Sequence, residues 1–171
     1  MTGQAANRDH IIALSGGVGG AKLALGLARI MPSESLTIVA NTADDFVHFG
    51  LHISPDIDTV LYTLADLANP ETGWGRRGET WEFMGAMGGL GGETWFNLGD
   101  RDLALHVLRT NKLNQGASLS DVTTEMAQVM GIHVDVMPMS NDPVRTMVRT
   151  ADGLLPFQHY FVRDRCELSV T

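Results

Sequence analysis

The chain has 171 residues, of which 44% are apolar and 19% charged, and its formal net charge is −8. This length suits one globular domain with a sizeable core, and the composition excludes a disordered chain. The acidic charge excludes general attraction to nucleic acid or anionic membranes, so a phosphorylated ligand would need backbone N–H groups or a divalent cation.

The cysteine count and the hydropathy pattern indicate the compartment in which the protein is expected. The single cysteine, Cys166, excludes an internal disulfide framework and a multi-cysteine zinc site. No apolar stretch approaches the roughly 20 residues that cross a bilayer. Four glycines interrupt the apolar run after Arg8, which argues against a signal peptide. We therefore expect a cytoplasmic protein with no membrane or nucleic-acid partner, a disordered segment over 1–9 and one domain over 10–171.

The first elements in chain order predict a βαβ unit. A buried strand over 11–14 enters a glycine-rich turn, a helix covers 21–31, and a second buried strand covers 36–40. Such crossovers are right-handed and imply a parallel sheet with helices on its faces. The predicted fold class is therefore α/β, a Rossmann-like three-layer fold with a mainly parallel sheet.

The remaining chain predicts helices first and strands later. After an irregular stretch we expect a helix over 58–68, and then a glycine- and tryptophan-rich flap over 71–92 that is mobile or partly helical. Ser120 is the expected cap of a helix that Gly131 ends. The further predicted elements are helices over 101–113 and 118–131, a strand over 132–139, and a β-hairpin over 144–162 that turns at Asp152-Gly153.

The turn SGGVGGAK, residues 15–22, resembles a phosphate cradle but fits neither standard nucleotide motif. A Walker loop needs Ser or Thr where Leu23 stands, and a dinucleotide fingerprint needs a third glycine where Lys22 stands. Glycines still let the backbone approach a phosphate at the positive end of a helix. The alternative is a tight turn that binds nothing. The candidate ligand-binding residues here are Gly16, Gly17, Gly19, Gly20, Lys22 and Asn41.

Aspartates follow the predicted strands and turns. Because the loops after parallel strands converge at one sheet edge, these carboxylates are expected to approach one another there. One or two carboxylates together with substrate phosphates suit Mg²⁺, and Asp45 and Asp44 are the candidate metal ligands. Asp56 and Asp58 are the candidate catalytic groups, as a base or as an acceptor for a substrate hydroxyl. For each aspartate, the alternative is a helix cap or a solvated turn.

Aromatic and basic residues add to this pattern. Trp74 stands between two glycines, where its ring could stack on a flat ligand or anchor the core. His106 and Arg109 are three residues apart and share a helix face. We interpret His106 as structural and Arg109 as a partner of a carboxylate or a phosphate.

Several segments of the chain resemble the 2-phospho-L-lactate transferase family, which builds coenzyme F-420 from a deazaflavin precursor. They occur in family order between residues 11 and 162. The most specific are SPDIDT, LGDRDLALH and PMSNDP, and the others are SGGVGGAK, NTADDF, GWGRRGET and ADGLLPFQHYFV.

This resemblance implies a magnesium-dependent transferase. It would move a phospholactyl or phosphoenolpyruvyl group from a GDP-linked donor to the ribityl hydroxyl of the deazaflavin, with GMP as the leaving group. Members of the family are roughly twice this length and tend to be homodimers, so the chain corresponds to their N-terminal half. Asp58 matches a deazaflavin-binding position, and Asn97 stands where some members have lysine. The further substrate-binding candidates are Trp74, Thr80, Asp100, Asp102, Arg109, Ser140 and Asp142.

Two other functions compete with the transferase. One is a sugar-nucleotide-binding regulator from the same superfamily, with no transfer chemistry, and the other is a generic nucleotide-binding domain. The segments SPDIDTVLY and GWGRRGET favour the transferase over the regulator.

Overall fold

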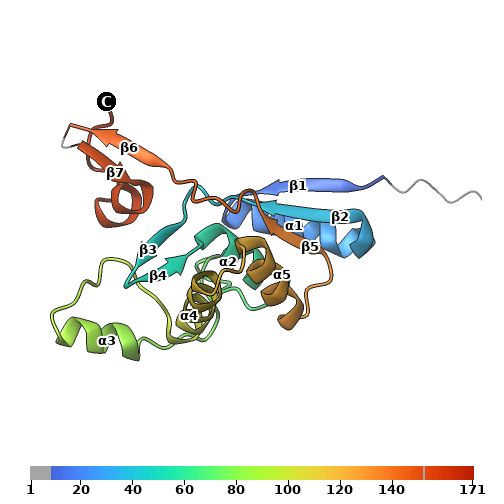
Figure 1. Ribbon diagram of the computed structural model, residues 1–171, viewed down its shortest axis with the longest axis horizontal. Coiled ribbons are helices and arrows are strands. Elements are labelled where there is room, and N and C mark those ends of the chain that lie inside the picture. The colour runs from blue at the N-terminus through green and yellow to red at the C-terminus, as the bar shows by residue number, and fades with distance from the viewer. Residues whose placement is uncertain (1–8, 152) are drawn as a thin grey trace, which may run out of the picture.

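A three-stranded parallel sheet forms the centre of the protein (Figure 1). The computed structural model describes residues 9–151 and 153–171. The strands β1 (Ile11–Ser15), β2 (Leu36–Ala40) and β5 (Asp135–Pro138) are ordered β1-β2-β5. The α/β class and the predicted βαβ unit are therefore confirmed. Most of the expected disordered segment over 1–9, and Asp152 of the expected turn, lie outside the described residues.

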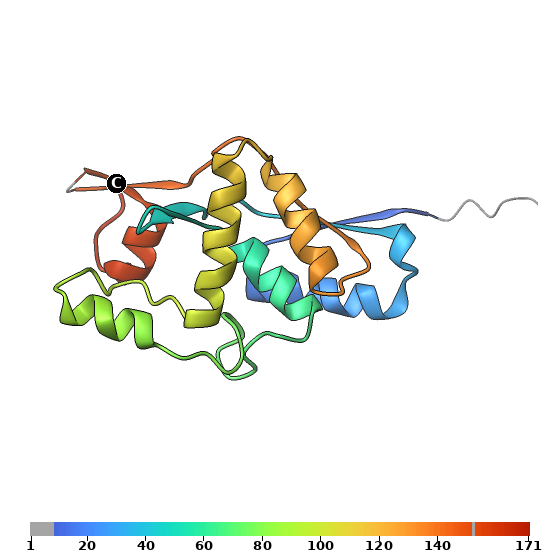
Figure 2. The ribbon, with the colours of Figure 1, turned by 60° about the horizontal axis from the view of Figure 1, so that its bottom comes forward.

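Helices cover one face of this sheet (Figures 1 and 2). The helices that contact its strands are α1 (Val18–Ile30), α2 (Pro55–Leu64) and α5 (Leu119–Val129), and α4 (Asp100–Asn114) packs against α5. α1 packs against α2 and β1, and α5 packs against β5. The core between the layers contains fully enclosed side chains such as Leu36, Ile38, Ile57 and Leu61. Burial of these side chains is the main force that holds the helices on the sheet.

The opposite face of the sheet is open among the described residues. Parallel pairing places Leu14 beside Val39, and Val39 beside Met137. Leu14 is 78% exposed and Met137 is 42% exposed. The expectation that the first strand is buried is therefore wrong, because β1 is an edge strand with helices on one side only. Two of the three expected layers are present in this part of the chain.

The helix starts differ from the predictions for local reasons. α1 begins at Val18, so its first turn includes Gly20, where a Cβ would lie 2.5 Å from Ser15 Oγ. α2 begins at Pro55, because proline suits the first helical position. α5 is capped by Ser118 rather than Ser120, in a capping box with Asp121.

A small hairpin occupies part of the stretch that was expected to be irregular. β3 (Phe46–His48) and β4 (Leu51–Ile53) pair antiparallel, and Gly50 turns between them with a φ of 75°. The flap expected over 71–92 contains one helix, α3 (Glu82–Gly89). Phe46 and Ile53 of the hairpin form a second small core with Met84 of α3 and with Leu98.

The expected C-terminal hairpin is present but shorter than predicted. β6 (Met147–Thr150) pairs with β7 (Gly153–Pro156), and a π-helix over His159–Arg163 replaces the rest of the predicted second strand. β7 ends at Pro156, and Phe157 N donates to Thr146 O directly after it. None of the described helices has the length and apolar character needed to cross a membrane.

Candidate functional site

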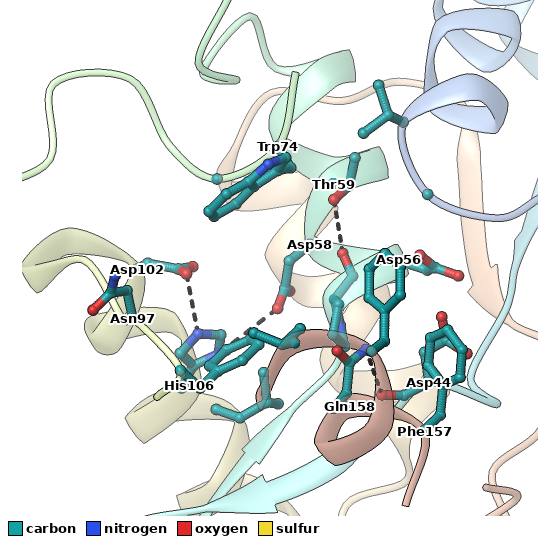
Figure 3. Close-up of a pocket in the computed structure, with 18 of the residues that line it drawn as sticks. Asp44, Asp56, Asp58, Thr59, Trp74, Asn97, Asp102, His106, Phe157 and Gln158 are labelled. Carbon is teal, nitrogen blue, oxygen red and sulfur yellow. Dashed lines mark hydrogen bonds and ion pairs between the residues drawn. The ribbon is translucent and has the colours of Figure 1, made fainter. Parts of the chain in front are cut away.

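A cavity of about 400 Å³, here called the main cavity, lies beyond the carboxyl ends of β1 and β2 (Figure 3). Backbone hydrogen bonds from Asn41 N to Ser15 O and from Met139 N to Ala40 O hold the post-strand loops together at this edge. Its walls come from the glycine turn, the starts of α2 and α4, the Trp74 loop and the C-terminal segment. The polar or charged lining side chains are Asp44, Asp56, Asp58, Thr59, Tyr62, Asn97, Asp102, His106 and Gln158.

At one end of the main cavity, the glycine turn meets carboxylates. Gly17 is the N-cap of α1, and a Cβ there would lie 2.9 Å from Asp56 Oδ1. Asn41 Nδ2 donates to Asp56 Oδ2 at 2.8 Å. Burial raises the pKa of Asp56, and burial together with the charge of Asp56 raises the pKa of Asp44. The two carboxylates suit a divalent cation, since the charge of Asp56 disfavours the ionisation of Asp44, and the helix N-terminus beside them suits a phosphate.

At the other end, α2 and α4 bring together a buried polar cluster. Arg109 donates to both carboxylate oxygens of Asp58, with Nη1 3.1 Å from Oδ2. The Tyr62 hydroxyl donates to Asp102 Oδ1. His106 lies between the two carboxylates, with Nε2 3.2 Å from Asp102 Oδ2 and Nδ1 3.7 Å from Asp58 Oδ2. Figure 3 shows Asp58, Asp102 and His106 pointing toward one another.

This cluster perturbs the ionisation of its members. Burial opposes the charge on Arg109, but Asp58 outweighs it and raises the pKa of the guanidinium. Burial likewise opposes ionisation of Asp102, yet His106, Tyr62 and Arg109 together hold the pKa of Asp102 below its usual value. Burial, Asp58 and Asp102 raise the pKa of the Tyr62 hydroxyl, so Tyr62 stays a hydrogen-bond donor.

Ligand atoms of Asp58, Asp102 and His106 lie within 4.8 Å of one another, which is close enough to surround a metal ion. Arg109 already occupies both oxygens of Asp58, and its Nη1 lies 3.4 Å from His106 Nδ1. A second cation would compete with a fully buried guanidinium, so the cluster does not suit a metal ion.

Aromatic rings make the apolar walls of the main cavity. Trp74 is 54% exposed and stands between Gly73 and Gly75, whose φ values are 74° and 72°. Phe157 and Phe161 stack with ring centroids 5.3 Å apart and an interplanar angle of 9°. Trp95, Phe96 and Tyr62 also contribute rings to the lining. Rings on several walls suit a flat aromatic ligand.

A second cavity of about 140 Å³, here called the small cavity, contains Asp45. Asp45 Oδ2 accepts from Ser54 Oγ at 2.8 Å, while Asp45 Oδ1 is buried without a hydrogen-bond partner. Burial raises the pKa of Asp45 to about 7. Asp44 faces the main cavity instead, so the structure separates the two candidate metal ligands.

The structure gathers about half of the predicted site residues. Those that line the main cavity are Gly17, Asp44, Asp56, Asp58, Trp74, Asn97 and Asp102, and Asn41 bonds to Asp56 behind them. Arg109 is buried and forms an ion pair with Asp58, which agrees with the predicted carboxylate contact rather than with the alternative, a phosphate contact. Asp142 lines the small cavity, and Ser140 Oγ accepts its backbone N–H.

The other candidates lie outside both cavities. Lys22 is exposed on α1. Asp100 accepts from Thr80 Oγ1 and from the backbone N–H groups of Glu82 and Phe83, so Thr80 and Asp100 stabilise the start of α3. The remaining glycines, Gly16, Gly19 and Gly20, shape the turn and the first turn of α1.

Sequence reasoning missed several lining residues. Tyr62 stands four residues after Asp58 on α2 and therefore shares its face, which is a signal that could have identified it. Phe157, Gln158 and Phe161 lie in the family segment ADGLLPFQHYFV, but local spacing could not place them at the cavity, because they reach it from about 100 residues beyond α2.

The topology and this cavity define an α/β protein with a cavity at the carboxyl end of a parallel sheet, which is where such folds bind ligands. The family model described as "2-phospho-L-lactate transferase CofD" matches residues 11–170. The chain therefore belongs to the 2-phospho-L-lactate transferase family, and the resemblance is confirmed.

Curated relatives support this assignment. A protein from Methanosarcina mazei named "2-phospho-L-lactate transferase" is 43% identical over 160 residues, which are 94% of this chain and 53% of that protein. One from Kitasatospora aureofaciens named "Phosphoenolpyruvate transferase" is 44% identical, over 90% of this chain and 50% of that protein. The chain thus spans about half the length of the curated relatives it matches.

A solved structure shares the fold. The crystal structure of a UPF0052 family member from Bacillus halodurans aligns with a TM-score of 0.57 at 19% identity, over 96% of this chain and 50% of that chain. At this identity, the similarity supports the architecture alone.

Proposed function

We propose that this chain carries the acceptor site, and part of the donor site, of a transferase. The reaction moves a phospholactyl or phosphoenolpyruvyl group from a GDP-linked donor to the ribityl hydroxyl of a deazaflavin in coenzyme F-420 biosynthesis. One observation carries the proposal. A single cavity joins a glycine cradle with two carboxylates at one end to a polar cluster with aromatic walls at the other.

The aromatic end suits the deazaflavin. A flat ring can stack on Trp74 or on the Phe157–Phe161 pair, while its polar side chain reaches Asn97 and Asp58. Asn97 cannot supply the positive charge of a lysine, so at this position it offers hydrogen bonds alone.

The glycine end suits the donor diphosphate and Mg²⁺. Asp44 and Asp56 both line the main cavity, and the charge of Asp56 raises the pKa of Asp44, so we assign the metal to Asp44 and Asp56 rather than to Asp44 and Asp45. Bound Mg²⁺ would neutralise charge on the transferring phosphoryl group. The amides that follow Gly17 would orient the phosphates.

Fluorescence polarisation of the deazaflavin, with and without Mg²⁺, tests acceptor binding. Trp74→Ala should weaken binding at least about fivefold, since a stacked ring is lost. Trp81→Ala is the matched control, because Trp81 is also half exposed but lies outside the cavity. GMP release from the GDP-linked donor tests transfer. We also propose that the protein is a homodimer, and light scattering tests this. Binding of a UDP-sugar with no deazaflavin signal would instead support the regulator.

A further inference from the structure

Two carboxylates reach the acceptor end of the main cavity, and they differ in how their charge is compensated. Arg109 contacts both oxygens of Asp58, so that carboxylate is neutralised by a fixed cation. Among the described residues, no lysine or arginine forms an ion pair with Asp102. The Asp102 side chain is 18% exposed, compared with 7% for Asp58. Asp102 is therefore the more accessible and the less neutralised of the two.

Tyr62 and His106 both direct a hydrogen toward the Asp102 carboxylate. Arginine can only donate, so the 3.4 Å contact of Arg109 Nη1 with His106 Nδ1 makes that nitrogen an acceptor. With Nδ1 as the acceptor, the ring hydrogen lies on Nε2, which is 3.2 Å from Asp102 Oδ2, at an angle outside hydrogen-bond geometry. Tyr62 donates to the other oxygen, Oδ1. Both neighbours present hydrogens to Asp102 and favour its ionised form.

We propose that Asp102 accepts the proton of the attacking acceptor hydroxyl, and that His106 and Tyr62 are positioning residues that hold its carboxylate. This assignment rests on the proposed function. It moves the base from Asp58 and Asp56, the expected catalytic residues, to a residue expected only to bind substrate. Asp58 instead accepts hydrogen bonds from Arg109, and Asp56 lies at the glycine end.

The step balances as follows. The acceptor hydroxyl oxygen forms a bond to the phosphorus that bears the three-carbon acid. The bond from that phosphorus to the oxygen of GMP breaks, and its electron pair leaves with GMP. The hydroxyl proton passes to Asp102. A weak base suffices, because the hydroxyl becomes strongly acidic only late in a loose phosphoryl-transfer transition state.

The charged and titratable groups near Asp102 come from α2, from α4 and from the loop that contains Glu79. α2 contributes Asp58 and Tyr62, and α4 contributes His106 and Arg109. Glu79 of the preceding loop accepts the backbone N–H of Asp102, which holds the start of α4 in place. A carboxylate-to-amide change at Asp102 leaves this backbone contact intact.

The test measures kcat and KM for GMP release, together with the Kd of the deazaflavin. Asp102→Asn should lower kcat about 100-fold or more while Kd changes less than about threefold, because the amide oxygen still accepts hydrogen bonds. Asp66→Asn is the control, because Asp66 is 96% exposed and lies outside the cavity. His106→Gln, which keeps a donor near the position of Nε2, should retain more kcat than His106→Leu at equal KM.

Three outcomes separate the possibilities. Wild-type GMP release with an Asp102→Asn kcat within about threefold of wild type overturns the assignment and leaves the proposed function standing. A wild-type chain that binds neither substrate, or that releases no GMP, overturns the proposed function and this assignment with it. If Asp102→Asn loses binding and activity together, Tyr62→Phe is measured next. The assignment of Asp102 as the base requires that kcat of Tyr62→Phe falls while its KM stays unchanged, and an unchanged kcat overturns it.

Discussion

The buried ion pair between Arg109 and Asp58 gives the sharpest stability prediction. Arg109 is 1% exposed and Asp58 is 5% exposed, so removal of one partner leaves the charge of the other largely buried. Arg109 also donates to His52 O at 3.4 Å, and that carbonyl would lose a partner as well. Removal of one member of a buried pair typically costs about 3–5 kcal/mol. For a chain of this size, the midpoint of thermal unfolding should fall by about 6–20 °C in Arg109→Met.

Urea unfolding of Arg109→Met, Asp58→Asn and the double variant measures the pair directly. Because the double variant leaves no uncompensated charge, its loss should be smaller than the sum of the single losses by about 1–3 kcal/mol. The control is Glu125→Gln, which breaks the exposed Lys112–Glu125 pair and should cost less than about 1 kcal/mol. If Arg109→Met costs no more than this control, or if the single losses add, the reasoning from burial is wrong.

Three further predictions concern the glycine turn, the sheet and the small cavity. Gly17→Ala should weaken binding of the GDP-linked donor, because its Cβ would lie 2.9 Å from an Asp56 oxygen. In the control Gly19→Ala, the Cβ would meet nothing within 4 Å, so binding measured by calorimetry should be unchanged. Ile38→Ala should lower the free energy of unfolding in urea by about 2–5 kcal/mol, since Ile38 is fully buried. Leu14→Ala on the open face should lower it by less than about 1 kcal/mol. Equal losses in the two variants would contradict the exposure of this face. Because the pKa of Asp45 is raised to about 7, its contribution to stability is present below about pH 4 and is lost as the pH rises toward 7. Asp45→Asn should therefore gain stability relative to wild type between about pH 5 and pH 8 in metal-free buffer. A stability difference that stays constant over this pH range would refute the prediction.

Local patterns in the sequence were enough for the architecture and the family. The run Leu36–Ala40 is apolar and short, and it forms the strand that was predicted. The C-terminal end of α5 also matches its prediction, because Gly131, with a φ of 73°, accommodates the turn that follows the helix. These features depend on neighbouring residues, so a single sequence contains the information. The motifs that identified the family are likewise contiguous segments.

Tertiary structure alone decided which candidates share a site. Arg109 and Asp58 are 51 residues apart, and only the packing of α4 near α2 shows that the arginine neutralises this aspartate. Asp44 and Asp45 are adjacent in the chain, yet they face different cavities, because Asp44 lies within a turn that the hydrogen bond from Asp45 N to Thr42 O closes. Burial and charge compensation depend on the whole fold. The choice between Asp58 and Asp102 as the base therefore follows from spatial neighbours that no local pattern contains.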